Sequence, residues 1–244
     1  MRVAIAQIEA IKGNIEKNIE NHLKWIKQAI RNNADMVVFP ELSLTGYEPE
    51  LAKDLATTSD DKRLDVFQEI CDLNKIVIGV GLPTKENDNL FISMIIFQPK
   101  RERVTYSKQY LYPTQVCHFT PGQKQIYLNI GDSIVAPAIC YDLSNPEHSK
   151  KAYEENANIY IASVLSDVDD IESDIKKLSA IACKYEMIVF MANFIGQSGG
   201  FECAGKSSVW DATGKLLGQL DTETEGILIY DTDTKEILSV QRSV

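Results

Sequence analysis

The sequence predicts an α/β or α+β fold, in which sheets are covered by helices that each have one apolar face. Short apolar runs, such as 36–39 and 134–139, have the length and composition of buried strands. Between such runs, apolar residues recur at three- and four-residue steps, as in 14–31, which is typical of an amphipathic helix. Strands and helices of this kind are interspersed along the chain, so the helices are expected to bury their apolar faces on sheets.

The N-terminal half of the chain begins with an expected strand at 3–8. A helix is expected at about 14–31, because one stripe of it is apolar: Ile15, Ile19, Leu23, Ile26 and Ile30. A second helix is expected at about 60–74, with an apolar face made of Leu64, Phe67, Ile70 and Cys71. Strands at 36–39, 76–81 and 90–97 complete this half, and a loop that carries Lys108 follows.

The C-terminal half is expected to contain a strand at 134–139 and a helix near 146–155. The start of this helix is marked by Asn145, which suits an N-cap, and by Pro146 at the first helical position. A strand at 159–164 and a strand at 187–193 flank a further helix that carries Ile171, Ile175, Leu178, Ala182 and Tyr185. The end is β-rich, with strands expected at 207–210, 216–220 and 226–230 and a hairpin turn at 212–215.

Length and composition favour one soluble domain. The 244 residues are 44% hydrophobic and no linker, repeat or low-complexity tract divides them, so a single domain over 1–244 is expected. The first residues lack the long apolar region and the cleavage site of a signal peptide. The longest apolar stretches, such as 187–192, are far too short to span a bilayer. We therefore expect a cytoplasmic protein with no membrane partner.

Charge and cysteine content exclude further classes of partner. A net charge of −10 and a pI near 4.9 argue against binding to nucleic acid or to anionic membranes, because both require a basic surface. The five cysteines are an odd number without a Cys-x-x-Cys pair, which predicts unpaired thiols in a reducing compartment. Neither a zinc site nor a disulfide framework is expected, and the predicted chemistry needs no metal and no cofactor.

Cys140 lies where a predicted strand ends and a loop leads into a helix, so the scaffold can present its thiol to a cleft. A thiol at such a place is a useful nucleophile only when a neighbouring group ionises it. Glu41 is one candidate, because it follows the buried strand at 36–39. Lys108 supplies a cation beside aromatic residues, upstream of the Phe-Thr-Pro-Gly turn at 119–122.

Glutamate, lysine and cysteine in this order resemble the carbon–nitrogen hydrolase (nitrilase) superfamily. The matching stretches are Phe39-Pro40-Glu41-Leu42 with Thr45-Gly46-Tyr47, Lys108 with Phe119 to Gly122, and Cys140-Tyr141-Asp142 with Pro146-Glu147. The similarity continues through Ala192-Asn193 and Gly205 to Leu217, so it covers nearly the whole chain. The resemblance implies an α+β fold of two mixed sheets packed face to face, a four-layer α-β-β-α sandwich. It also implies a homodimer or a higher homo-oligomer.

The resemblance assigns a role to each of these residues. Glu41 would accept the thiol proton of Cys140 and return it to the leaving ammonia or amine. Lys108, helped by the backbone N–H of Tyr141, would stabilise the oxyanion that forms when the thiolate attacks an amide carbonyl. Water activated by Glu41 would then hydrolyse the thioester. The predicted activity is therefore the hydrolysis of a small linear amide.

One position departs from the family pattern. Many family amidases carry a second glutamate four residues before the Phe of the Phe-x-Pro-Gly turn, where it hydrogen-bonds the catalytic lysine. Gln115 stands at that position in this chain. Glutamine keeps the hydrogen-bonding capacity and loses the negative charge, so Glu41 and Lys108 lack that neighbouring carboxylate. We expect the hydrolase class to be unchanged, and the substrate, the rate and the pH optimum to differ.

Candidate pocket residues follow strands whose ends should surround Cys140: Tyr47, Tyr141, Ser163, Asn193 and Phe194. Gln115 is a further candidate substrate-binding residue, because of its position before the Phe-Thr-Pro-Gly turn. A packing role in the cleft wall is the alternative for each of them. The polar, glycine-rich segment 197–202 is expected to be a loop, either at the rim of the cleft or as a plain connection.

Rival interpretations remain for the cysteines and histidines. Cys71 and Cys183 are expected in the core, whereas Cys117 and Cys203 are expected in loops that could border the cleft. A papain-like Cys–His mechanism is disfavoured, because nothing around Cys140 resembles that motif. Of the three histidines, His22 is expected at a helix surface or an interface and His148 in a structural role, and His118 is the third. Two other functions stay open: a catalytically silent family member that binds a metabolite or a partner, and the hydrolysis of a nitrile.

Overall fold

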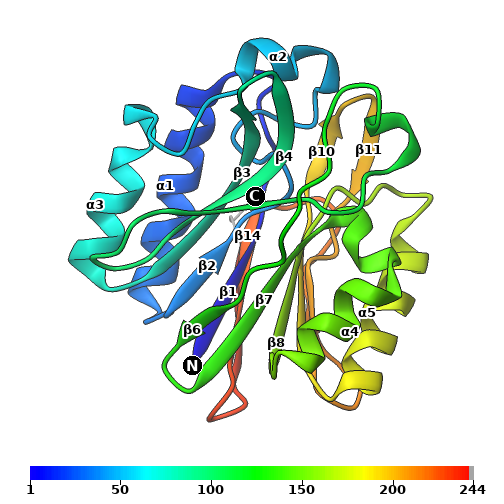
Figure 1. Ribbon diagram of the computed structural model, residues 1–244. Coiled ribbons are helices and arrows are strands. Elements are labelled where there is room, and N and C mark those ends of the chain that lie inside the picture. The colour runs from blue at the N-terminus through cyan, green and yellow to red at the C-terminus, as the bar shows by residue number, and fades with distance from the viewer. Residues whose placement is uncertain (242–244) are drawn as a thin grey trace.

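The structure is a computed structural model that describes residues 1–241. Two mixed sheets pack face to face, and helices cover the outer face of each (Figure 1). Helices α1 (Ile15–Arg31) and α3 (Asp65–Asn74) lie on one outer side, and α4 (Pro146–Glu154) and α5 (Ile171–Tyr185) lie on the other. A short helix, α2 (Ala52–Leu55), lies at one end. The predicted α-β-β-α sandwich is therefore confirmed.

The first sheet has the strand order β15-β14-β1-β2-β3-β4-β5. Its strands are β1 (Arg2–Gln7), β2 (Met36–Val38), β3 (Val77–Glu86), β4 (Asn89–Phe97), β5 (Val104–Ser107), β14 (Gly226–Asp231) and β15 (Ile237–Gln241). Pairing is parallel between β1, β2 and β3 and antiparallel elsewhere. The end of β2, which leads to Glu41, therefore lies in the centre of this sheet.

The second sheet has the strand order β13-β12-β9-β8-β7-β6. Its strands are β6 (Leu128–Ile130), β7 (Ser133–Ile139), β8 (Ile159–Ser163), β9 (Ile188–Ala192), β12 (Ser208–Trp210) and β13 (Leu216–Gln219). The three central strands β7, β8 and β9 are parallel, so the chain leaves all three at the same edge of the sheet. A separate hairpin is formed by β10 (Ile195–Ser198) and β11 (Phe201–Ala204).

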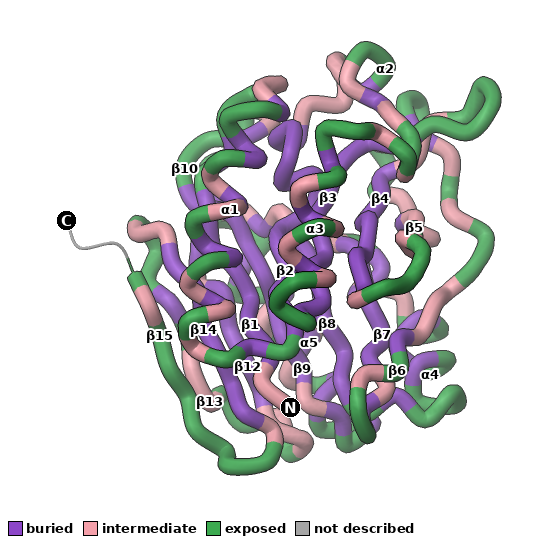
Figure 2. Tube along the Cα trace, turned by 90° about the vertical axis from the view of Figure 1, so that its left-hand side faces the viewer, coloured by how far each residue is buried: buried purple, intermediate pink, exposed green. Residues whose placement is uncertain are grey.

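The alternating direction of side chains along the strands explains why both faces of each sheet are covered. In β1, Val3 and Ile5 pack into the core between the two sheets, whereas Ala4 and Ala6 pack against the helices. Neighbouring residues of a strand point to opposite faces, so a strand that is apolar throughout must be covered on both sides. In the second sheet, the same alternation separates Ile159 and Ile161 from Tyr160 and Ala162. Figure 2 shows the buried residues concentrated along these strands.

Local signals set the helix boundaries as expected. The side chain of Asn14 accepts a hydrogen bond from Lys17 N at the start of α1 (3.1 Å). Asn145 caps α4 by accepting from Glu147 N, and Pro146 occupies its first position. The helix predicted at about 60–74 is shorter, because 62–64 form a separate 3₁₀ turn before α3 begins at Asp65.

Several elements differ from the sequence prediction. The segment before Lys108 is strand β5, and the chain also contains β6 and β15, three short or edge strands without a long apolar run. The glycine-rich segment 197–202 is the turn and flanks of the β10–β11 hairpin, where Gly199 and Gly200 both have positive φ. His22, expected at a helix surface or an interface, is buried within the fold, where its ring stacks on Phe39 at 4.1 Å.

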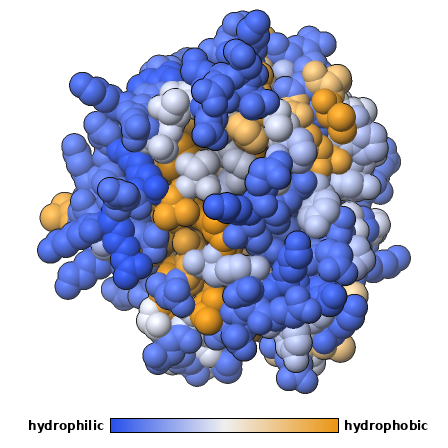
Figure 3. Space-filling model, viewed as in Figure 1, coloured by the Kyte–Doolittle hydropathy of each residue, from blue (hydrophilic) through white to orange (hydrophobic). Residues whose placement is uncertain are grey.

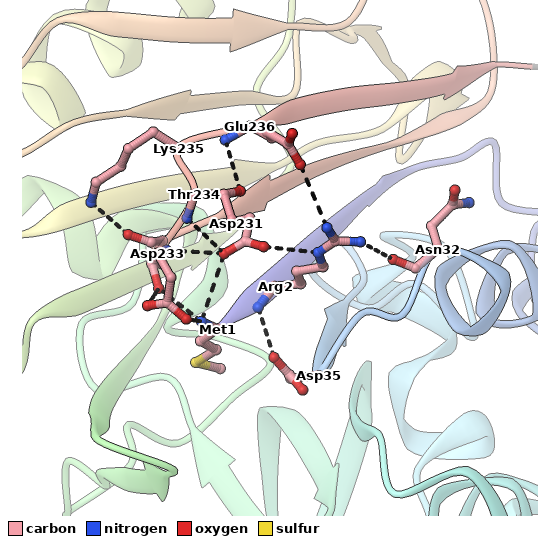
Figure 4. A network of polar contacts seen from close by, with 10 residues as sticks. Met1, Arg2, Asn32, Asp35, Asp231, Asp233, Thr234, Lys235 and Glu236 are labelled. Atoms are coloured by element: carbon pink, nitrogen blue, oxygen red, sulfur yellow. Dashed lines mark hydrogen bonds and ion pairs between the residues drawn. The ribbon is translucent and has the colours of Figure 1, made fainter.

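A polar network joins the ends of neighbouring strands at one end of the first sheet (Figure 4). The guanidinium of Arg2 on β1 pairs with Asp231 at the end of β14 (2.9 Å) and with Glu236 beyond it (3.6 Å). Its backbone N–H donates to Asp35, just before β2 (2.7 Å). The Arg2 guanidinium holds the pKa of Asp231 below its ordinary value. The network therefore joins β14, β1 and β2 at the start of β2, whereas Glu41 follows the other end of that strand.

The surface is mostly hydrophilic, as the net charge of −10 leads one to expect. Figure 3 shows hydrophobic side chains exposed mainly along the centre of one face, between the two halves of the sandwich. No helix within residues 1–241 has the length and the apolar character that a membrane span requires.

Candidate active site

Three turns that follow strand ends carry the candidate residues. Glu41 lies three residues after β2, Lys108 directly after β5, and Cys140 directly after β7. The first two strands belong to one sheet and β7 belongs to the other, so the site spans the seam between the sheets. Across this seam, the hydroxyl of Ser163 donates to the Phe39 carbonyl (2.7 Å) and anchors the Glu41 turn to the second sheet.

Glu41 and Lys108 form a buried ion pair. The distance from Lys108 Nζ to Glu41 Oε1 is 2.7 Å, and both side chains are fully buried. The second carboxylate oxygen, Glu41 Oε2, is also buried and has no hydrogen-bond partner within residues 1–241. An orphaned carboxylate oxygen in such a place can accept a proton or a hydrogen bond from a bound molecule.

The turn that carries Glu41 is held by close backbone contacts. Leu42 has a φ of +53°, in the left-handed region that L-residues seldom adopt. Gly81 on β3 lies against this turn, and a Cβ there would come within 2.6 Å of the Pro40 carbonyl oxygen. Ser43 Oγ accepts from Gly81 N (3.1 Å) and lies 2.9 Å from Nε2 of the buried His22. Burial lowers the pKa of His22 to about 3, so this imidazole is neutral and structural.

Lys108 is fixed through its own backbone. Its N–H donates to the Ile92 carbonyl on β4 (2.8 Å), and its carbonyl accepts from Gly122 N (2.8 Å). A Cβ at Gly122 would collide with the backbone of Ser107, so the Phe-Thr-Pro-Gly turn needs glycine at that position. The spacing between Lys108 and this turn is therefore the sequence signature of a backbone contact.

Cys140 begins a 3₁₀ turn (Cys140–Ser144) and is itself strained. Its φ is +45°, an unfavourable value that costs an L-residue about 1–2 kcal/mol. Its Sγ lies 3.7 Å from the Leu165 carbonyl oxygen, and the residue is half-buried. The backbone reversal turns the thiol away from the strand and toward the cavity that Glu41 also lines.

Asp142 connects the Cys140 turn to the Lys108 turn. Its Oδ1 accepts from Gln109 N (3.1 Å) and Tyr110 N (2.9 Å), just after Lys108. Its Oδ2 accepts from Ile139 N (2.9 Å), just before Cys140, and from the Tyr106 hydroxyl (2.6 Å). With its side chain fully buried, this carboxylate fixes the spacing of the two turns. Asp142 was quoted from the sequence only as part of a motif, because three of its four partners lie more than thirty residues away.

The buried His148 extends this network in a structural role, as expected. Its Nε2 lies 2.7 Å from the Tyr106 hydroxyl, and its Nδ1 lies 2.8 Å from the Tyr160 hydroxyl. Burial lowers its pKa, despite the opposing effect of Asp142. The side chain is therefore neutral, and it holds the Tyr106 hydroxyl toward Asp142.

Electrostatics set the resting protonation state of the site. Burial, together with the negative charge of Glu41, raises the pKa of the Cys140 thiol, and Lys108 only partly opposes this. Burial also disfavours the charge on Lys108, but its pairing with Glu41 outweighs this and the pKa of the ammonium is raised. The Cys140 thiol therefore rests protonated beside the Glu41–Lys108 ion pair, and it needs a base during attack.

One cavity of about 90 Å³ gathers the side chains at the seam. It is lined by Glu41, Tyr47, Tyr112, Thr114, Gln115, Cys140, Leu165, Asp167, Asp170 and Phe201. Of the predicted substrate-binding residues, Tyr47 and Gln115 line it and hydrogen-bond each other, with Gln115 Nε2 2.9 Å from Tyr47 Oη. Gln115 Oε1 accepts from Tyr112 N (2.9 Å), so its amide is held by the cavity wall.

Three predicted substrate-binding residues lie outside the cavity wall. Ser163 faces the Phe39 carbonyl, as described above, and Phe194 is a core residue. The buried amide of Asn193 donates to the carbonyls of Ser166 and Gly205 and so links two chain segments. Tyr141 follows Cys140 in the 3₁₀ turn, and its ring meets Tyr112 edge-on at 5.2 Å. The oxyanion role of its backbone N–H stays a prediction.

Five residues of the cavity wall were not predicted from the sequence: Tyr112, Thr114, Leu165, Asp167 and Asp170. Phe201 was anticipated only as part of the segment 197–202, one of whose expected places was the rim of the cleft. Strand ends do lie around Cys140, but the residues that line the cavity stand farther along the chain than predicted. The residues after β8 that reach the cavity are Leu165 and its successors, two or more positions beyond the strand end at Ser163.

None of the other four cysteines lines this cavity. Cys71 is buried, as expected, whereas Cys183, expected in the core, is exposed on α5. Cys203 is buried on strand β11, and Cys117 is exposed with its Sγ 3.3 Å from the Thr114 carbonyl oxygen. In the described part of the chain, no three His, Cys, Asp or Glu side chains are grouped so that they could hold a metal ion.

We expect Asp142→Asn to lower kcat/KM for amide hydrolysis by about 10- to 100-fold and stability by about 3 kcal/mol. An asparagine cannot accept all four hydrogen bonds, and its NH₂ group would face a donor. Steady-state rates and denaturant unfolding of the purified variant measure the two effects. Tyr106→Phe, which removes one of the four donors, should have a smaller effect on both. Unchanged kcat/KM in Asp142→Asn would contradict the positioning role.

Comparison with known proteins places this site in a family. The model of the family described as carbon-nitrogen hydrolase matches residues 2–242. The chain is 26% identical to the "Hydrolase in agr operon" of Staphylococcus aureus, over 97% of this chain and 93% of that protein. It is 24% identical to the 2-oxoglutaramate amidase of Bacillus subtilis, over 99% and 94% of the two chains. A solved amidase from Nesterenkonia sp. AN1 shares the fold, with a TM-score of 0.85, 24% identity and coverage of 96% and 94%.

Proposed function

The chain belongs to the carbon–nitrogen hydrolase family, and from this premise we propose that it hydrolyses a small linear amide through a thioester on Cys140. The observation that carries the proposal is the buried Glu41–Lys108 pair, whose carboxylate lines the same small cavity as the Cys140 thiol. This arrangement supplies a nucleophile, a base and a cation within one site.

The first half of the reaction forms the thioester. The unpartnered Oε2 of Glu41 takes the thiol proton as Sγ attacks the amide carbonyl carbon, and a C–S bond forms. The negative charge that develops on the carbonyl oxygen is stabilised by the Lys108 ammonium and by the Tyr141 N–H. The C–N bond then breaks, and the proton on Glu41 passes to the leaving ammonia or amine.

The second half of the reaction releases the acid. Glu41 takes a proton from a water molecule that attacks the thioester carbonyl, and a second tetrahedral oxyanion forms at the same place. Collapse of this intermediate breaks the C–S bond and returns the proton to Sγ, so the neutral thiol is restored. The raised pKa of Cys140 suits this cycle, because the thiol is reprotonated in the resting enzyme.

Relatives support an amide as the substrate. Two relatives carry amidase names, a 2-oxoglutaramate amidase and an (R)-stereoselective amidase, and a variant of the Nesterenkonia amidase was solved in complex with butyramide. The cavity of about 90 Å³ is small, which suits a short substrate.

Ammonia release from a panel of short primary amides tests this proposal. We expect turnover of at least one amide by the wild-type protein and none by Cys140→Ala. A parallel set of nitriles of the same chain lengths tests the rival C–N reaction, and faster ammonia release from the nitriles would favour it. Calorimetric binding of an amide without any ammonia release would instead identify a silent member of the family.

A further inference from the structure

We propose that the substrate is a short amide that carries a positively charged group a few bonds from the amide carbon. This inference rests on the proposed function and names the substrate class of the same site. It comes from the acidic side chains Asp167 and Asp170, which line the cavity together with the Glu41 and Cys140 side chains.

The two aspartates give the cavity negative charge that no direct ion pair among the described residues neutralises. Among the described residues, neither forms an ion pair with a Lys, Arg or His side chain, although the next acid along α5, Asp174, pairs with Lys177 (3.0 Å). Asp167 Oδ1 accepts from the backbone N–H groups of Asp169 (3.1 Å) and Asp170 (2.9 Å), which leaves Oδ2 available. Lys108, the one cation buried at the site, is already paired with Glu41.

The two ends of the cavity differ in character. At the base, Glu41 is 1% exposed, and its Oε2 has no partner within residues 1–241. At the mouth, Asp170 is exposed and Asp167 is half-buried. An amide whose carbonyl reaches Cys140 at the base therefore places its far end beside the two carboxylates. The orphaned oxygen of Glu41 identifies the base as a place for the polar amide end of a ligand.

Aromatic side chains make the mouth more favourable for a cation. Tyr112 and Phe201 are both about half exposed at the cavity wall, at 45% and 42%, and Tyr47 meets Phe201 edge-on at 6.1 Å. Aromatic faces attract ammonium and guanidinium groups, and more strongly than they attract neutral polar groups. Carboxylates beside aromatic rings thus complement a cation in two ways.

Repulsion between the neighbouring carboxylates also favours a cationic ligand. The pKa of Asp170 is raised, by partial burial first and then by the negative charges of Asp167 and Asp174, which outweigh the opposing effect of Lys177. A bound cation would relieve this repulsion, whereas a second carboxylate would add to it. A substrate with an anionic end, such as a dicarboxylic acid monoamide, should therefore be disfavoured.

Three amides of nearly equal length test the inference: 4-aminobutanamide with a cationic end, pentanamide with a neutral end and succinamate with an anionic end. We expect kcat/KM to fall in that order, with about tenfold between the cationic and the neutral amide at low salt. Asp170→Asn and Asp167→Asn should each lower the ratio of cationic to neutral kcat/KM by about threefold. Asparagine at position 167 retains the side-chain oxygen that caps the turn.

Asp169→Asn is the matched control. Asp169 is an exposed acid in the same turn and is absent from the cavity wall, so its replacement should leave the ratio unchanged. The inference would be overturned by a wild-type ratio of cationic to neutral kcat/KM of one or less. It would also be overturned if Asp169→Asn lowered this ratio as much as Asp170→Asn does. Neither result would contradict the amidase function.

Binding separates failure of this inference from failure of the proposed function. If no amide is turned over by the wild-type protein, the proposed function fails. Calorimetry with Cys140→Ala then decides the inference by itself. Tighter binding of 4-aminobutanamide than of pentanamide supports a cation-selective site, and equal or weaker binding overturns it.

Discussion

Replacing Cys140 with alanine is expected to abolish amide hydrolysis, with kcat/KM reduced by at least about 10⁴-fold. The substitution removes the only side chain of the cavity wall that can form a thioester. It removes one sulfur atom from a half-buried position, so the melting temperature should change by no more than about 3 °C. Steady-state ammonia release and thermal unfolding of the same preparation measure both quantities.

Two further variants make the Cys140 result specific. Cys140→Ser should also be nearly inactive, because a carboxylate deprotonates a hydroxyl far less readily than a thiol. Cys183→Ala is the control, since Cys183 is an exposed thiol on α5 and its loss should leave kcat/KM unchanged. Near wild-type turnover by Cys140→Ala would refute the thioester mechanism.

Breaking the buried ion pair should give the second large effect. Glu41→Gln removes the base and leaves Lys108 charged and unpaired in a fully buried site. We expect kcat/KM to fall by about 10³-fold or more and the free energy of unfolding to fall by about 3–5 kcal/mol. Lys108→Met, which leaves the Glu41 carboxylate without its cation, should destabilise the protein to a similar extent.

The double variant Glu41→Gln/Lys108→Met separates catalysis from stability. Since no charge is left unpaired, it should be more stable than either single variant, yet as inactive as Glu41→Gln. Denaturant unfolding measured on all four proteins gives the coupling energy of the pair. Additive losses of stability in the double variant would show that the two charges do not depend on each other.

The ion pair should also have a signature in alkaline unfolding. The pKa of Lys108 is raised in the folded protein, so the folded state binds its proton more tightly than the unfolded state does. This stabilisation is complete below the ordinary lysine pKa and is lost as the pH rises through the folded-state value. The difference in unfolding free energy between the wild type and the double variant should therefore stay constant up to neutral pH and shift against the wild type only in strong alkali.

The sequence by itself determined the elements with strong periodicity and the three turns that carry chemistry. Strand β1 and helix α1 follow from spacing alone, because strands and helices bury their residues at different periods. The motifs around Glu41, Lys108 and Cys140 were recognisable for a related reason. Each motif depends on a local backbone conformation or contact: Cys140 has a positive φ, and Gly122 leaves room for the backbone of Ser107. Such requirements restrict the residue types at fixed spacings.

Tertiary structure decided which groups those turns meet. A lysine that follows Tyr-Ser looks like a surface residue, and Lys108 is buried only because Glu41 from another strand pairs with it. Asp142 joins its own turn to the Lys108 turn, whose backbone N–H groups at Gln109 and Tyr110 are 33 and 32 residues away in the sequence. Asp167 and Asp170 reach the cavity only because β8 ends beside β7 in the second sheet. Hydrogen bonds and charge pairs act over a few ångströms of space, so partners far apart in the chain leave no spacing pattern in a single sequence.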